Sequence, residues 1–107
     1  MVSHAIYPRF GQRRASLEPK TYALLRSLGF EGVAVTDSLG VLGSPYAPYW
    51  ARLALRAGAD MVLTTSPRDA GRMVDALVPL ARAGELDAAV VRVLRYRRSL
   101  GLPRPSR

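Results

Sequence analysis

Three polar positions lie in or directly after short apolar runs of the sequence, and such positions can place side chains where chemistry occurs. Asp37 directly follows the run 32–36 and precedes a loop rich in glycine, serine and proline. His4 lies in the run 1–7, and Thr64-Thr65 lie at the end of the run that begins at residue 60. In parallel β/α folds, functional groups sit at the C-terminal ends of strands and on the loops that follow. Asp37 is therefore a candidate catalytic carboxylate, although helix capping or loop closure by this residue is an equally open interpretation.

Three short runs with strand character must position these residues. They are residues 1–7, which Pro8 stops, and then residues 32–36 and 60–64. The run 32–36 is nearly continuous in apolar residues and rich in β-branched ones, which is typical of a strand covered on both faces of a parallel sheet.

Helices are expected between and after these runs, because apolar residues recur there at helical spacing. Ser16 is predicted to cap the first helix, with Pro19 in its first turn, and Ser66 with Pro67 is predicted to open the third. Glycine readily ends a helix in the left-handed conformation, and the predicted helix ends are at Gly29, Gly58, Gly84 and Gly101. Strands alternating with helices predict an α/β fold with a parallel sheet.

Four stretches, in order, resemble the end of the catalytic barrel of glycoside hydrolase family 3, particularly its β-N-acetylhexosaminidase-like branch. Residues 1–8 resemble the family's sixth strand, 15–19 the turn that opens the next helix, 24–40 the nucleophile segment and 57–63 the eighth strand. The specific part is the Leu-Gly-Phe-Glu-Gly-Val segment followed by Thr36-Asp37. The alanine- and glycine-rich turn at 57–60 alone is a weak signal.

The resemblance implies a partial parallel (β/α) TIM barrel, comprising about the last three βα units and the closing helices. Residues 1–102 would be the C-terminal fragment of the family's N-terminal barrel domain, and residues 103–107 a disordered tail. Asp37 would be the nucleophile of a retaining glycosidase acting on a β-linked N-acetylglucosaminide or glucoside. His4 would line the sugar pocket, or simply be a hydrogen-bonded histidine at a strand end. Asp60, at a strand start, would be structural.

The rest of the mechanism is missing from these residues. The family's acid/base histidine, in a Lys-His-Phe-Pro-Gly-His-type loop, has no counterpart, nor does the glutamate that the β-glucosidase branch takes from a following domain. Ser38 and Val41 stand where the family often has an acid and a methionine. A barrel also needs eight strands and about 250 residues. We therefore expect a truncated or split enzyme that is inactive alone and has the missing barrel half as its partner.

The amino-acid composition excludes several classes of protein and of site. An apolar content of 49% argues against disorder, and the absence of cysteine excludes disulfides and thiolate metal sites; neither a metal nor a cofactor is expected. No apolar run is long enough for a membrane span and no secretory signal is visible, so the default expectation is cytoplasmic.

The net charge of +8 suggests a different class of function. Residues 1–87 contribute only +2, and the other six charges are arginines of the last helix and tail. The alternative is thus a small basic α/β binding module whose arginine-rich last helix binds nucleic acid or an acidic partner. Nucleic acid is not the expected partner, because no aromatic residues alternate with these arginines in the manner of a base-stacking surface.

Overall fold

The computed structural model describes residues 1–106 and shows an α/β arrangement around two parallel strands, β1 (Val35–Ser38) and β2 (Met61–Leu63). The opening segment lies along the other edge of β1. The Val2 N–H donates to the Val35 carbonyl at 2.7 Å, and the Asp37 N–H donates to the Val2 carbonyl at 2.8 Å. The predicted α/β class with parallel strands is therefore confirmed.

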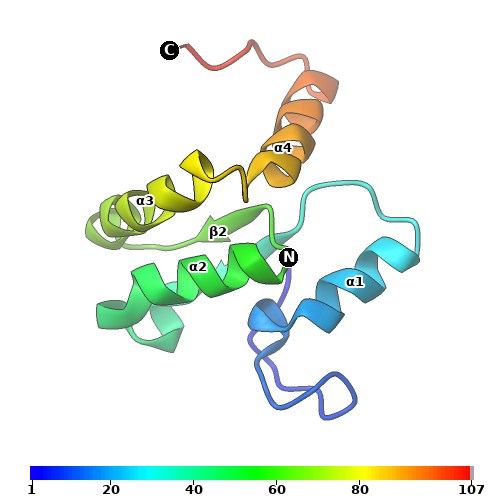
Figure 1. The fold of residues 1–107 in the computed structure, drawn as a ribbon, viewed down its shortest axis with the longest axis vertical. Coiled ribbons are helices and arrows are strands. Elements are labelled where there is room, and N and C mark those ends of the chain that lie inside the picture. The colour runs from blue at the N-terminus through cyan, green and yellow to red at the C-terminus, as the bar shows by residue number, and fades with distance from the viewer. Residues whose placement is uncertain (107) are drawn as a thin grey trace.

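Helices and 3-10 turns follow each strand. The α-helices are α1 (Pro19–Ser27), α2 (Ala47–Ala57), α3 (Pro67–Arg82) and α4 (Asp87–Ser99), and the 3-10 turns are η1 (Ala15–Leu17), η2 (Leu39–Leu42) and η3 (Ser44–Tyr46). Helices α2 and α3 pack against each other, whereas α4 extends away from the strands toward the C-terminus (Figure 1). No helix among the described residues combines the length and apolar character needed to cross a membrane.

The strand boundaries differ from those predicted. The predicted strand at 1–7 is reduced to a bridge between Val2 and Thr36, because beyond it the segment turns to pair with residues 14–16. The predicted strand at 32–36 instead spans Val35 to Ser38. Its start is delayed because the Ala34 N–H binds a side chain, the Asp60 carboxylate, at 2.9 Å. Asp37 thus lies inside β1 rather than after it.

The first helix also begins later than predicted. Ser16 lies in η1, and the N-cap of α1 is Glu18, whose carboxylate accepts a hydrogen bond from the Lys20 N–H at 3.3 Å. Pro19 explains the difference, because a proline disfavours helical conformation at the preceding residue, and Glu18 is extended. The predicted Ser66 cap of α3 is confirmed, since its hydroxyl accepts from the Asp69 N–H at 3.2 Å.

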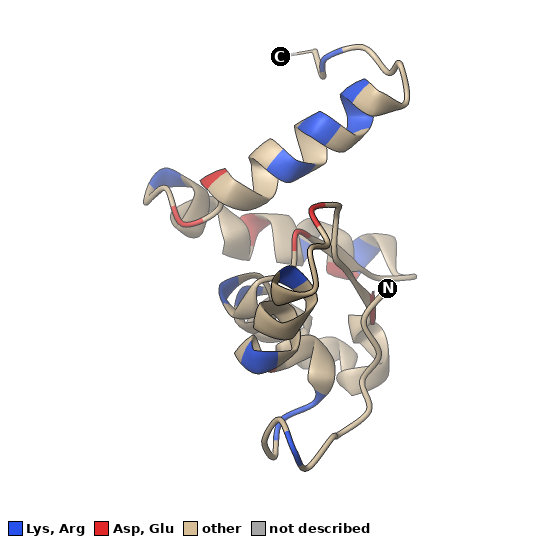
Figure 2. Ribbon diagram, turned by 90° about the vertical axis from the view of Figure 1, so that its right-hand side faces the viewer, with Lys and Arg blue, Asp and Glu red and all other residues tan. Residues whose placement is uncertain are grey.

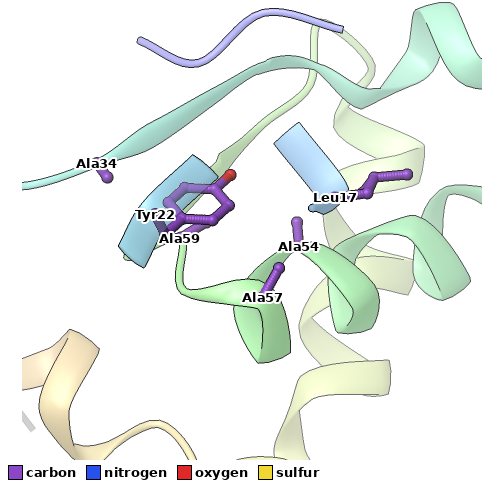
Figure 3. Close-up of a cluster of buried hydrophobic side chains, with 6 residues drawn as sticks. All are labelled: Leu17, Tyr22, Ala34, Ala54, Ala57 and Ala59. Carbon is purple, nitrogen blue, oxygen red and sulfur yellow. The ribbon is translucent and has the colours of Figure 1, made fainter. Parts of the chain in front are cut away.

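The main core is built from small side chains around one tyrosine. Tyr22 of α1 is buried between Ala34 and the alanines of α2 and its C-terminal turn, as Figure 3 shows. Gly58 lets α1 approach this closely: a Cβ atom there would lie 2.7 Å from the Tyr22 Cβ, and its φ of 127° suits glycine alone. The core members are Leu17, Tyr22, Ala34, Ala54, Ala57 and Ala59.

Several large apolar side chains of the helices and of β2 are exposed. Leu28 is 76% exposed, and α4 has no buried residue although Val90 and Leu94 lie on its apolar side. On β2, Met61 and Leu63 are 45% and 36% exposed. Within the described residues, β2 pairs with β1 alone. The chain thus has more large apolar side chains than it buries in its own core.

Asp60 links four parts of the fold. Its side chain is fully buried, and Oδ2 accepts from Arg26 Nη2 at 2.7 Å and from the Ala34 N–H, while Oδ1 accepts from Arg92 Nε at 2.7 Å. These donors belong to α1, to the segment before β1 and to α4. A carboxylate buried without such partners would be strongly destabilising. Asp60 therefore fixes the start of β2 against all three of these segments.

We predict that Asp60→Asn lowers the free energy of unfolding by about 3 kcal/mol, because it leaves two arginines without their counter-ion. Urea unfolding followed by circular dichroism measures this change. Glu85→Gln is the matched control: Glu85 also pairs with an arginine, Arg56, but both side chains are solvent-exposed. It should change stability little. Equal losses for the two variants would contradict the role of Asp60.

A second prediction concerns alkaline pH. Burial, followed by the negative charge of Asp60, raises the pKa of Tyr22 well above its ordinary value. The folded state therefore favours the neutral phenol, and its stability should be complete below the unfolded pKa of about 10 and fall as pH rises beyond it. Unfolding measurements across this range should show a steeper decline for the natural chain than for Tyr22→Phe. Parallel declines would contradict the prediction.

Candidate active site

The candidate nucleophile, Asp37, is the third residue of β1 and is half-buried. Its Oδ1 accepts a hydrogen bond from the Ser38 N–H at 2.7 Å, which orients the carboxylate. Among the described residues, Oδ2 has no hydrogen-bond donor. The preceding residue, Thr36, is fully buried, and its hydroxyl accepts from the Leu63 N–H at 3.2 Å. Asp37 thus sits on a fixed backbone with one carboxylate oxygen available.

His4 lies beside the end of β1, and both of its ring nitrogens are engaged within the chain. Nε2 lies 2.8 Å from the Ser38 carbonyl oxygen, and Nδ1 lies 2.7 Å from the Ser16 hydroxyl. A carbonyl only accepts hydrogen bonds, so Nε2 carries a proton; in the neutral imidazole Nδ1 then accepts from the Ser16 hydroxyl. The prediction that His4 contacts a sugar is not tested by these bonds, but they leave only the carbon atoms and faces of the ring for such a contact.

The loop after Asp37 is attached to the start of α3. The Ser44 hydroxyl donates to Asp69 Oδ2 at 2.6 Å, and Arg72 Nη2 donates to the Pro45 carbonyl at 2.9 Å. From α2, Trp50 Nε1 donates to the Leu42 carbonyl at 3.1 Å. Two turns of 3-10 helix, η2 and η3, therefore replace the irregular loop expected from its glycine and proline content.

Asp69 is a residue whose role sequence reasoning missed. Its position three residues after Ser66 predicts a helix-capping acid, yet its side chain is buried and binds Ser44 of the loop. Its hydrogen bond to the distant Ser44 distinguishes Asp69 from an ordinary acid in the first turn of a helix, and only the folded structure shows that bond. Of the two positions that depart from the family pattern, Ser38 is engaged by His4, and Val41 is 77% exposed.

Thr64 and Thr65 do not join this site through any hydrogen bond. The Thr64 hydroxyl accepts from the Ser66 N–H at 3.2 Å and so stabilises the turn into α3. Asp60, expected to be structural, is engaged by two arginines. No three His, Cys, Asp or Glu side chains gather closely enough to hold a metal ion anywhere in residues 1–106. The candidate site therefore consists of Asp37 and the residues that hold its backbone.

Four arginines lie in α4, and blue segments mark them along this helix in Figure 2, although other blue segments lie elsewhere in the chain. One of its arginines, Arg92, is used internally by Asp60. Another, Arg97, donates to the Pro103 carbonyl at 3.2 Å. Residues 103–106 form neither helix nor strand. Part of the basic charge of the last helix thus serves to hold the chain's own carboxylate and tail.

Comparisons with known proteins identify the family. The model of the glycosyl hydrolase family 3 N terminal domain matches residues 1–96. A β-hexosaminidase of Thioalkalivibrio sulfidiphilus is 41% identical over 85 residues, which are 72% of this chain and 24% of the relative. The chain therefore spans about a quarter of the curated relative it matches.

Solved structures agree with that match. A family 3 glycosyl hydrolase of Mycobacterium smegmatis is 33% identical with a TM-score of 0.75, over 86% of this chain and 32% of that one. A family 3 β-N-acetylglucosaminidase of a Paenibacillus species is 25% identical with a TM-score of 0.74, over 99% and 23%. The arrangement around Asp37 is thus part of a larger known domain, and this chain belongs to glycoside hydrolase family 3.

Proposed function

We propose that this chain is the C-terminal part of the catalytic barrel of a retaining β-N-acetylhexosaminidase, with Asp37 as the nucleophile. The observation that supports this most is the carboxylate itself: it lies in β1, one oxygen is oriented by the Ser38 N–H, and the other has no donor among residues 1–106. Relatives named β-hexosaminidase and β-N-acetylglucosaminidase favour a β-linked N-acetylglucosaminide over a β-glucoside as substrate.

In this mechanism the free Asp37 oxygen attacks the anomeric carbon while the glycosidic bond breaks. A covalent glycosyl-enzyme forms, and water then releases the sugar with its original configuration. Both steps need a second group that first donates a proton to the leaving oxygen and then accepts one from water. This chain contributes the nucleophile and its orientation.

That second group must come from outside the chain. His4, the sole histidine, has both nitrogens hydrogen-bonded, and the Asp60 and Asp69 carboxylates are buried and paired elsewhere. None of the three is available to transfer a proton to a sugar in this arrangement. The isolated chain is therefore catalytically silent, and the active unit includes the rest of the barrel.

The remaining barrel, whether part of the same polypeptide or a separate chain, is the proposed partner. Its first strand would pair with the outer edge of β2, where Met61 and Leu63 are partly exposed. A hollow between β2 and α4 is lined almost wholly by apolar side chains, including Leu55, Val90 and Leu94, and offers the same partner a surface to bury. Residues 1–102 would then all belong to one barrel domain, with the residues after them as a tail.

We expect the isolated chain not to hydrolyse a chromogenic N-acetyl-β-glucosaminide. Co-expression with the N-terminal barrel portion of the Thioalkalivibrio β-hexosaminidase should restore turnover, because that portion supplies the missing strands and proton donor. Asp37→Asn should then lower kcat by at least about 10³-fold, the scale of loss for a member of a catalytic unit.

The matched control is Asp75→Asn, which removes an exposed carboxylate on α3 and should leave kcat unchanged. Turnover by the isolated chain would contradict the proposed silence. Turnover of the complemented barrel that survives Asp37→Asn would contradict the proposed nucleophile. Binding of DNA that weakens steeply with added salt would instead favour the arginine-rich helix α4 as a binding surface.

A further inference from the structure

A chain of hydrogen bonds runs from the core to the residue after Asp37. The Tyr22 hydroxyl, buried in the core, donates to the Ser16 carbonyl at 2.7 Å. His4 Nε2 donates to the Ser38 carbonyl, and His4 Nδ1 lies 2.7 Å from the Ser16 hydroxyl, which donates to it when the imidazole is neutral. With a neutral imidazole, every donor in this series of hydrogen bonds meets an acceptor. The core is thereby connected to the end of β1 through Ser16 and His4.

Ser38 is consequently held at both of its backbone groups. Its N–H binds the Asp37 carboxylate at 2.7 Å, and its carbonyl binds His4 at 2.8 Å. A rotation of this residue would change the carboxylate orientation and break the bond to His4 together. The η2 turn begins at the next residue, Leu39, which is fully buried, so the chain on the far side is also fixed.

We propose that His4 is a positioning residue: its neutral Nε2–H tautomer holds the Ser38 backbone and, through it, the carboxylate of Asp37. The importance of that carboxylate rests on the proposed function, but the hydrogen-bonded arrangement does not. Neutral imidazole suits this place because it offers a donor on one nitrogen and an acceptor on the other. His4 needs both, since the Ser38 carbonyl only accepts a hydrogen bond and the Ser16 hydroxyl can donate one.

Two other roles fit the observations less well. A hydroxyl and an imidazole 2.7 Å apart resemble a nucleophile with its general base, but Ser16 is fully buried and no substrate could reach it. A proton donor to the sugar would need a nitrogen that faces the substrate, and both nitrogens of His4 face the chain itself. Holding the backbone is the role that uses every contact the ring makes.

The tautomer can be read directly, because His4 is the only histidine of the chain. Long-range ¹H–¹⁵N NMR of the full 107-residue chain without a histidine tag, at about pH 8, should give one pyrrole-like signal for Nε2 and one pyridine-like signal for Nδ1. The opposite tautomer would overturn the proposal. Averaged signals, as from an imidazole that exchanges freely between both forms, would overturn it as well.

Variants test the link from His4 to Asp37. His4→Leu should shift the backbone amide signals of Ser38 and Leu39, because it removes the donor to the carbonyl between them. His4→Gln keeps an amide donor at similar reach and should restore both signals toward their original positions. Ser3→Ala, on the adjacent exposed residue, is the matched control and should leave them in place.

Unchanged Ser38 and Leu39 signals in a folded His4→Leu chain would refute the link. If His4→Leu does not fold, the comparison of His4→Gln with the natural chain decides, and large shifts in both signals would count against the proposal. None of these measurements needs turnover. An inactive complemented barrel would therefore contradict the proposed function and leave the role of His4 standing, whereas a wrong tautomer would do the reverse.

Discussion

The buried carboxylate of Asp60 is the interaction on which the arrangement of this chain depends. Two arginines from distant helices and one backbone N–H converge on it, and the N–H belongs to the residue that precedes β1. Because a lone buried charge is strongly unfavourable, the three donors must be present together, and their presence sets where β1 can begin. The start of the strand at Val35 in turn brings Asp37 to its exposed end.

At the C-terminal end of β1, hydrogen bonds rather than ion pairs hold the backbone in place. The Asp37 carboxylate is oriented by the Ser38 N–H, Ser38 is held by His4, and the following loop is attached to α3 through Ser44 and Asp69. One end of β1 is thus fixed by ion pairs and the other by hydrogen bonds. This division suits a parallel β/α protein, in which stability is built at the bottom of the strands and chemistry at the top.

Sequence patterns predicted the parts of this fold that local chemistry decides. Ser66 and Pro67 predict the start of α3, and the apolar run before Asp37 predicts a strand, because both depend on neighbouring residues. Ser16 failed as a cap because Pro19 forces Glu18 into an extended conformation. The bonds of His4 to Ser16 and Ser38 and the bond of Asp69 to Ser44 were not predictable, since these partners lie at least twelve residues apart and only the folded chain brings the groups together. Apolar residues of β2 and α4 also lie at the spacing expected of a buried face, yet several of their side chains are exposed.

We propose that a barrel completed by other residues uses Asp37 as its nucleophile. A fluorinated N-acetylglucosaminide with a good leaving group, which forms the glycosyl-enzyme faster than water releases it, would capture that intermediate on the complemented barrel. Peptide mass spectrometry should then locate the sugar on Asp37, and Asp37→Asn should abolish the labelling. A sugar on another carboxylate, or none while the barrel turns over substrate, would contradict the role of Asp37 as nucleophile.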